Sequence, residues 1–226
     1  MLHPPAELRL DAAGLPYLKV WEPGTHTVFD TRGRSRKIEV ASLPDPWALE
    51  GAWSVHFPRG WGAPSHKVFD QLISWTDAAE DGIRHFSGRA VYRKIFELPL
   101  ELLEAGSSVE LDLGVVQHVA RVTLNGRNLG VLWKPPYLLD VTGVAVPGRN
   151  ELVVEVANTW ANRIAGDAYL PPDQQYCRSN ILRTRAVKGL RLQPSGLIGP
   201  VRILQGRNLR LYPRETQATK SGHAIQ

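Results

Sequence analysis

The chain has 226 residues, of which 43% are hydrophobic and 22% charged, and both fractions are ordinary for a globular protein. This length suffices for one large domain or for a domain with an appendage, and the composition excludes a chain that is disordered throughout. No stretch approaches 18 uninterrupted apolar residues, so the sequence predicts no transmembrane helix and no membrane partner.

The formal net charge of +5 raises the question of a nucleic-acid partner. The one compact basic run, TRGRSRK at residues 31–37, contains no aromatic side chain on which a base could stack. The other arginines are spread along the chain, and no zinc-finger spacing or aromatic RNA-binding signature is present. We therefore predict that the run is the solvated tip of a hairpin and that nucleic acid is not a partner.

The first residues, MLHPPAELRLD, lack the basic region and apolar run of a secretory signal peptide. The expected location is the cytoplasm, or the periplasm or extracellular space if the sequence is a fragment of a longer secreted enzyme. Cys177 is the single cysteine, which excludes an internal disulfide and a multi-cysteine zinc site. We interpret Cys177 as a small apolar residue rather than as a nucleophile.

In chain order, residues 1–45 contain the strand-like stretches LKVW and HTVFD, then the basic run, then KIEV. We predict a β segment, an extra hairpin, that leads into the main domain. Beyond it, RAVYRKIFELP and SVELDLG read as strands, and Val109, Leu111 and Leu113 occupy one face of the second. A helix is not expected anywhere beyond one or two turns.

The stretch ARVTLNGRNLGVL predicts a hairpin. Val122 and Leu124 alternate with polar residues, and Leu129 and Val131 continue the alternation after the turn. Asn125 and Gly126 readily adopt the positive φ angles that a tight two-residue hairpin turn requires. The next strand, PGRNELVVEVAN, has its turn at Pro147–Gly148 and directs inward the residues Leu152, Val154 and Val156.

Short strands at roughly ten-residue spacing, separated by Gly and Pro turns, are typical of all-β sandwiches. The sequence therefore predicts an antiparallel β-sandwich of the jelly-roll, galactose-binding-domain-like kind over residues 46–212, which ends with the strand GPVRILQG and its extension. Residues 213–226 are polar and unpatterned, and we expect a flexible tail.

Metal and nucleophile motifs are absent from the sequence. The seven histidines lie far apart, without an HExxH pattern, and no EF-hand loop is present, so no metal or other cofactor is expected. Calcium held by scattered oxygens is left open without a motif that supports it. Ser195 lies in PSGLIGP, where Pro and Gly favour a turn over a nucleophile.

Carboxylates in loops are the candidates for glycosidase chemistry, which uses a pair of them. They are Asp70, Asp77, Glu80, Asp81, Asp167 and Asp173. Each of them can equally be a solvated surface carboxylate, and this is the commoner role.

Aromatic residues give the strongest signal, since there are seven Trp, and Trp61, Trp75, Trp133 and Trp160 lie in turn-rich sequence. We assign Trp53, within the alternating AWSVHF, to the core. An indole face can stack on a sugar ring, while Arg, Asn and Asp bind hydroxyls. The segment NTWANRIAGD combines these groups directly after a strand, as a rim loop. We therefore predict a sugar-binding rim formed by Trp133, Lys134, Asn158, Trp160, Asn162, Arg163 and Asp167.

These motifs also carry a resemblance to a known family. FSGRAVYRKIFELP, NGRNLGVLWKPPYLLDVT, VPGRNELVVEVANTWANRIAGD and SGLIGPVRI are similar to the jelly-roll sugar-binding domain of glycoside hydrolase family 2. They resemble more closely the C-terminal jelly roll of the α-L-rhamnosidase-like enzymes of glycoside hydrolase family 106. In those enzymes catalysis belongs to a large barrel that precedes the jelly roll, and this sequence contains no such barrel.

The resemblance implies a carbohydrate-associated module whose partners are a plant or bacterial glycan, which can contain rhamnose, and a catalytic domain or chain. Two alternatives stay open. The chain could be a small glycosidase that uses Asp167 with Asp77 or Glu80. It could also be a purely structural domain that packs on a catalytic partner and binds no sugar.

Overall fold

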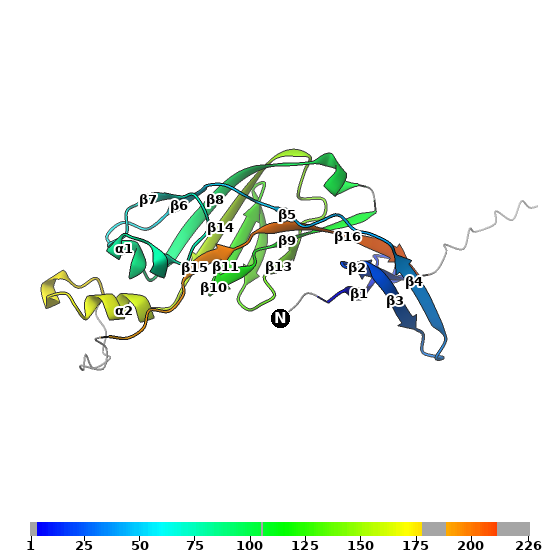
Figure 1. Cartoon of the computed structure of the whole chain (residues 1–226), viewed down its shortest axis with the longest axis horizontal. Helices are drawn as coiled ribbons and strands as arrows, with labels where there is room; N and C mark the ends of the chain where they lie inside the picture. The colour runs from blue at the N-terminus through cyan, green and yellow to red at the C-terminus, as the bar shows by residue number, and fades with distance from the viewer. Residues whose placement is uncertain (1–3, 105, 178–188, 212–226) are drawn as a thin grey trace, which may run out of the picture. The chain divides into compact units, whose positions relative to one another are not determined.

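The computed structural model describes residues 4–104, 106–177 and 189–211, which divide into two units (Figure 1). Pro44–Gln205 form the larger unit, and Pro4–Leu43 form the smaller one together with residues 206–211. The last residues of the strand β16 (Arg202–Arg210) thus group with the N-terminal segment, although the sequence reads them as the end of the sandwich. The expected tail, residues 213–226, lies outside the described residues.

The larger unit is an antiparallel β-sandwich, which confirms the predicted all-β class. One sheet has the order β12-β11-β14-β8-β6-β7, and the facing sheet runs through β16, β9 and β13, with β5 paired to β16. The strands are β5 (Trp47–Ala48), β6 (Trp53–His56), β7 (His66–Phe69), β8 (Arg89–Leu98), β9 (Ser107–Asp112), β11 (Val119–Leu124), β12 (Arg127–Leu132), β13 (Leu138–Asp140) and β14 (Gly148–Ala157), with the small pair β10 (Val115–Gln117) and β15 (Gly196–Gly199).

The core follows the alternation seen in the sequence. In the register of the central strands, Val122, Val154 and Tyr92 form one inward row across β11, β14 and β8. Leu111 on β9, in the facing sheet, is also fully buried and belongs to the same hydrophobic core. Every side chain that the alternation assigned to the inner face of β9, β11 and β14 is buried, namely Val109, Leu111, Leu113, Val122, Leu124, Leu152, Val154 and Val156. Trp53 is buried as predicted.

The outward positions of the same strands carry paired charges. Glu151 lies 3.1 Å from Arg93, and Glu155 lies between Arg89 and Arg121 at 3.6 and 3.8 Å. These exposed pairs are expected to contribute little to stability, under about 1 kcal/mol each. Their main effect is to keep the polar side of each strand in water, which fixes the register of a sheet with one packed face.

The predicted hairpin has the expected turn, but its second strand differs from the predicted alternation. Leu124 pairs with Arg127, which leaves Asn125 and Gly126 as the central residues, with φ of 51° and 77°. The Asn125 side chain fixes the turn, since its Oδ1 accepts the Glu151 N–H at 2.9 Å. The register then shifts by one residue, and Val131 is 51% exposed rather than inward. An extra residue in one strand moves the following side chains to the opposite face.

Replacing Gly126 by Val should lower the free energy of unfolding by about 1 kcal/mol or more, because a β-branched residue resists positive φ. A Cβ at this position meets no atom within 4 Å, so backbone strain is the whole effect. Denaturant unfolding measures the loss, and Arg127→Val at the exposed neighbouring position is the control. Equal stability of the Gly126→Val protein and the wild type would contradict the prediction.

The smaller unit consists of two hairpins. β1 (Ala6–Leu10) pairs with β2 (Pro16–Val20), which also pairs with the end of β16, and β3 (Gly24–Phe29) pairs with β4 (Ser35–Val40). A small core of Leu18, Val20, Val40 and Leu211 holds them together. The basic run extends from the tip of the second hairpin into β4, as predicted, and the Asp30 carboxylate accepts the N–H groups of Arg32 and Arg34 in the turn.

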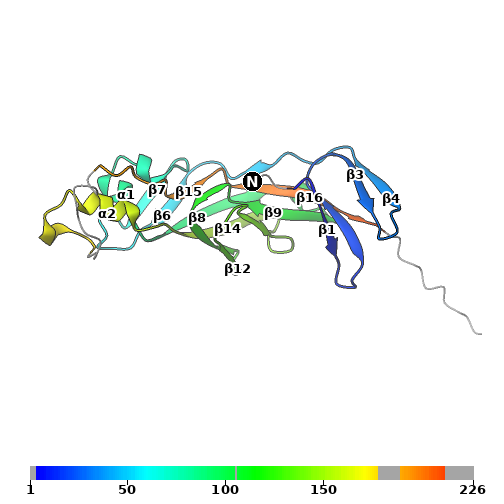
Figure 2. The ribbon, with the colours of Figure 1, turned by 90° about the horizontal axis from the view of Figure 1, so that it is seen from below.

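Helices are short and gather at one end of the sandwich. Both views place α1 (Asp81–Arg84) and α2 (Ala161–Asp167) at the end of the sandwich where β7 lies (Figure 1, Figure 2). Three 3-10 turns complete the described elements: η1 (Trp75–Asp77), η2 (Leu100–Leu103) and η3 (Pro172–Gln174). The end that carries α2 contains most of the residues that the sequence assigned to a sugar-binding rim.

Candidate functional site

The segment after β14 folds into a helix, which corrects the prediction of a rim loop. α2 begins at Ala161 and ends at Asp167. Its buried residues include Asn162, Arg163 and Asp167, so its inner face is largely polar. A search for apolar residues at helical spacing therefore misses it, since that search assumes a hydrophobic inner face.

Arg163 and Asp167 form a buried ion pair along α2. Arg163 Nε lies 3.0 Å from Asp167 Oδ1, and the two side chains are only 4% and 2% exposed. The second carboxylate oxygen accepts the Cys177 N–H at 2.8 Å. The guanidinium lies over the Tyr176 ring, 4.5 Å from its centroid, and Nη1 donates to the Trp61 carbonyl at 3.4 Å. Tyr176 was not among the predicted site residues, because nothing in the local sequence pattern links it to Arg163.

The two asparagines bind backbone and Ser195 rather than facing solvent. Asn158 Oδ1 accepts the Gly88 N–H, and its Nδ2 donates to the Phe86 carbonyl and to Ser195 Oγ. Asn162 Nδ2 donates to Ser195 Oγ and to the Gln193 carbonyl. Ser195 is itself buried in the irregular segment directly before β15, so it is not an open nucleophile.

These contacts make a clasp, by which we mean Asn158, Asn162, Arg163, Asp167 and Ser195. It joins α2 to the turn before β8 and to the segment before β15. The side chains of Asn158, Asn162, Arg163 and Asp167, which were expected to bind sugar hydroxyls, thus already have partners inside the protein. Their first role is to hold the rim in place, because releasing one would leave a buried polar group without a partner.

Two of the predicted aromatic platforms remain open to solvent. Trp160 is 52% exposed, and its ring packs on Trp61 with 5.4 Å between centroids. Trp133 is 68% exposed, with the Lys134 ammonium 5.4 Å from its ring centroid. The register pairs Leu132 with Ala120 and Ala120 with Val156, so Trp133 leaves the sheet at the same end as Trp160, with β11 between the two strands. Trp75, by contrast, is fully buried.

Asp167 is not part of an accessible pair of carboxylates, because Arg163 and Cys177 engage both of its oxygens. Glu80 binds Lys67, and this hydrogen bond lowers the pKa of the Glu80 carboxyl. Asp77 is exposed in a polar pocket with Arg191 and Gln193. The remaining candidates, Asp70, Asp81 and Asp173, are exposed.

Within residues 4–104, 106–177 and 189–211, no three His, Cys, Asp or Glu side chains lie together as a metal site would require. In the same part of the chain, no helix is long and apolar enough to cross a membrane.

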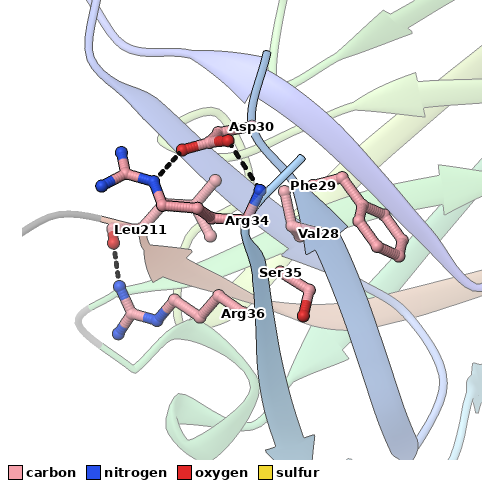
Figure 3. A pocket seen from close by; sticks show the side chains of 7 residues that line it. All are labelled: Val28, Phe29, Asp30, Arg34, Ser35, Arg36 and Leu211. Atoms are coloured by element: carbon pink, nitrogen blue, oxygen red, sulfur yellow. Dashed lines mark hydrogen bonds and ion pairs between the residues drawn. The ribbon is translucent and has the colours of Figure 1, made fainter. Parts of the chain in front are cut away.

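The smaller unit has a pocket of about 260 Å³ between the tip of the β3–β4 hairpin and Leu211 (Figure 3). Arg34 Nε donates to Asp30 Oδ2 at 2.7 Å, and Arg36 donates to the Leu211 carbonyl. The Arg34 guanidinium also holds the pKa of the Asp30 carboxyl below its usual value. Both arginines already bind groups of the smaller unit. This pocket is therefore a weaker candidate for a ligand site than the α2 end.

Comparisons with known proteins show what this β-sandwich is similar to. No family model matches the chain. A protein of Formosa agariphila named "Putative beta-glucuronidase" is 42% identical over 151 residues, which are 67% of this chain and 13% of that protein.

Solved structures give a similar result. The rhamnosidase of Novosphingobium sp. PP1Y is 28% identical, with a TM-score of 0.64 over 89% of this chain and 24% of that one. A β-D-glucuronidase of Dictyoglomus thermophilum shares the fold at 20% identity, with a TM-score of 0.50 over 72% of this chain. This chain is therefore a glycoside hydrolase-related domain. It spans 13% of the curated relative and 24% of the rhamnosidase.

Proposed function

We propose that the chain is a carbohydrate-binding accessory domain of a rhamnosidase- or glucuronidase-like glycoside hydrolase and has no catalytic site of its own. The observation that carries the proposal is the coverage of the matches, which span a minor part of much larger hydrolases. The engagement of Asp167 in a buried ion pair supports it, because a general acid or nucleophile has to reach the substrate. The partners proposed are a plant or bacterial glycan, such as one that contains rhamnose, and a catalytic domain or chain.

At the α2 end, the proposed contacts are the exposed indoles of Trp160 and Trp133 with the Lys134 ammonium. Asn158, Asn162, Arg163 and Asp167 would then hold these platforms in place. Such a surface suits a sugar, because an indole packs on its C–H face while an ammonium donates to its hydroxyls.

A glycan array followed by titration with rhamnosides and galactosides tests this function. We expect millimolar or tighter binding by the wild type, and a loss of about tenfold in Trp133→Ala or Trp160→Ala, equivalent to about 1.4 kcal/mol. Both side chains are exposed, so the variants should keep the wild-type melting temperature. Equal affinity in all three proteins would show that the α2 end is not the sugar site.

A purely structural role is the second candidate, and the internal engagement of the clasp favours it. A domain that binds no glycan on the array, yet forms a complex with a hydrolase catalytic domain, would fit this candidate. The third candidate, a small glycosidase, predicts hydrolysis of aryl glycosides that Asp77→Asn abolishes. Asp77 is chosen because it is exposed, so its substitution does not disturb the core.

A further inference from the structure

We infer a second sugar-binding site on this domain, in the pocket between β5 and the second half of β8, where a neutral pyranose stacks on Trp47. The inference rests on the proposed carbohydrate function but concerns a different surface from the α2 end. The pocket has a volume of about 570 Å³, within the range of small-molecule sites. The residues that line it include Trp47, Glu50, Lys94, Ile95 and Glu97.

Trp47 is an exposed indole against which no other aromatic ring or cation of the described residues packs. All seven Trp lie in the described part of the chain, and the three exposed ones are Trp47, Trp133 and Trp160. Trp160 packs on Trp61, and the Lys134 ammonium lies over Trp133. Among the described residues no aromatic ring or cation occupies the face of Trp47, which is 41% exposed in a concave wall. A free indole face in a pocket is the element that stacking on a sugar ring requires.

The backbone holds this indole in a fixed position. Trp47 pairs with Ile203 of β16, and the Leu49 N–H donates to the Val201 carbonyl at 2.9 Å. Lys94 fixes the turn below the pocket, because its ammonium donates to the carbonyls of Glu50 and Ala52. The pocket is therefore preformed, and binding does not have to order a loop.

The opposite wall is the part of β8 beyond its pairing with β6. β6 pairs with β8 as far as Arg93, and among the described residues the rest of β8 pairs only with β14. The Ile95 side chain is 54% exposed there and offers an aliphatic surface. This surface would favour a sugar with a methyl group, such as a 6-deoxy sugar, over one with a fully hydroxylated edge.

The charged side chains that line the pocket favour a neutral ligand. Glu50 and Glu97 are exposed carboxylates, whereas the Lys94 ammonium is turned to backbone carbonyls. Ionised carboxylates only accept hydrogen bonds, and vicinal sugar hydroxyls supply the donors. A uronate would place a third negative charge beside two others, which opposes its binding.

The test follows the indole Nε1–H signals of the ¹⁵N-labelled protein during titration. The signal of Trp47 is assigned by its absence in Trp47→Phe. Methyl α-L-rhamnoside and methyl β-D-galactoside should shift this signal, and methyl β-D-glucuronide should bind about tenfold more weakly because of the two carboxylates. Glu97→Gln removes one of these carboxylates and should reduce the difference in affinity between the glucuronide and the neutral glycosides.

Trp160→Ala and Trp133→Ala are matched controls, since they remove exposed indoles elsewhere and should leave the Trp47 response unchanged. A glycoside that binds the wild type without moving the Trp47 signal would overturn this site and leave the proposed function standing. Preference for the glucuronide would overturn the neutral ligand class, and a response only to an extended peptide along β8 would overturn a sugar as the ligand. Failure of every glycan on the array to bind contradicts the proposed function itself, and this inference with it.

Discussion

Replacing Arg163 by Met is expected to lower the free energy of unfolding by about 3–5 kcal/mol, because it leaves a buried carboxylate without its partner. Asp167 is 1% exposed and, among the described residues, would keep only the Cys177 N–H as a close donor to its side chain. The guanidinium also contributes contacts with the Tyr176 ring and the Trp61 carbonyl, which Met cannot replace. Denaturant unfolding followed by circular dichroism measures the loss.

Two further variants test whether the unpaired buried carboxylate causes this loss of stability. Arg93→Met breaks the exposed pair with Glu151 and should change stability by less than about 1 kcal/mol. The double variant Arg163→Met/Asp167→Leu removes both buried charges and should be more stable than Arg163→Met alone, since no uncompensated charge remains. If Arg163→Met matched Arg93→Met in stability, the ion pair would not be what holds α2 in place.

Gly196→Ala is expected to destabilise the sandwich by about 2–4 kcal/mol, because the added methyl group enters a packed core. An ideal Cβ on Gly196 would lie 2.6 Å from Tyr92 Oη and 2.7 Å from Trp75 Nε1. The φ angle of 96° adds strain for any residue with a side chain. Thermal unfolding and the near-ultraviolet circular dichroism of the buried aromatics are the measurements.

The neighbours of Gly196 cannot easily move aside. Tyr92 Oη accepts hydrogen bonds from Trp75 Nε1–H and from the Leu197 N–H, and burial raises the pKa of this phenol. Gly143→Ala is the control, because Gly143 also has positive φ but a Cβ there meets no atom within 4 Å. It should cost no more than about 1 kcal/mol. Equal losses for the two alanine variants would show that strain alone, and not crowding, acts at Gly196.

The sandwich strands could be predicted because their evidence is local. The alternation in SVELDLG, ARVTL and ELVVEV assigns Leu111, Val122 and Val154 to the core, and all three are fully buried. Asn125–Gly126 specifies its turn through φ angles that few other residues adopt. Such signals span only a few residues, so they do not depend on the rest of the fold.

The candidate site depended on contacts between distant parts of the chain. The segment NTWANRIAGD suggested exposed hydrogen-bonding groups, but Asn162 and Asn158 meet Ser195, more than 30 residues away in sequence. The same composition serves a sugar site or a buried network, and only the positions of Ser195 and Gln193 distinguish them. Trp75 lies in turn-rich sequence, and its burial against Phe57 and Phe86 is likewise not visible in the local pattern.

The sequence by itself determined the all-β class, the core faces of the strands, the tight turn at Gly126 and the resemblance to glycoside hydrolases. Tertiary structure alone decided which polar side chains are buried, that α2 is a helix with a polar inner face, and which indoles keep an open ring. The physical reason is that strand and turn preferences arise from each residue and its immediate neighbours. Burial of Arg163 and exposure of Trp47 depend instead on partners that only the folded chain brings together.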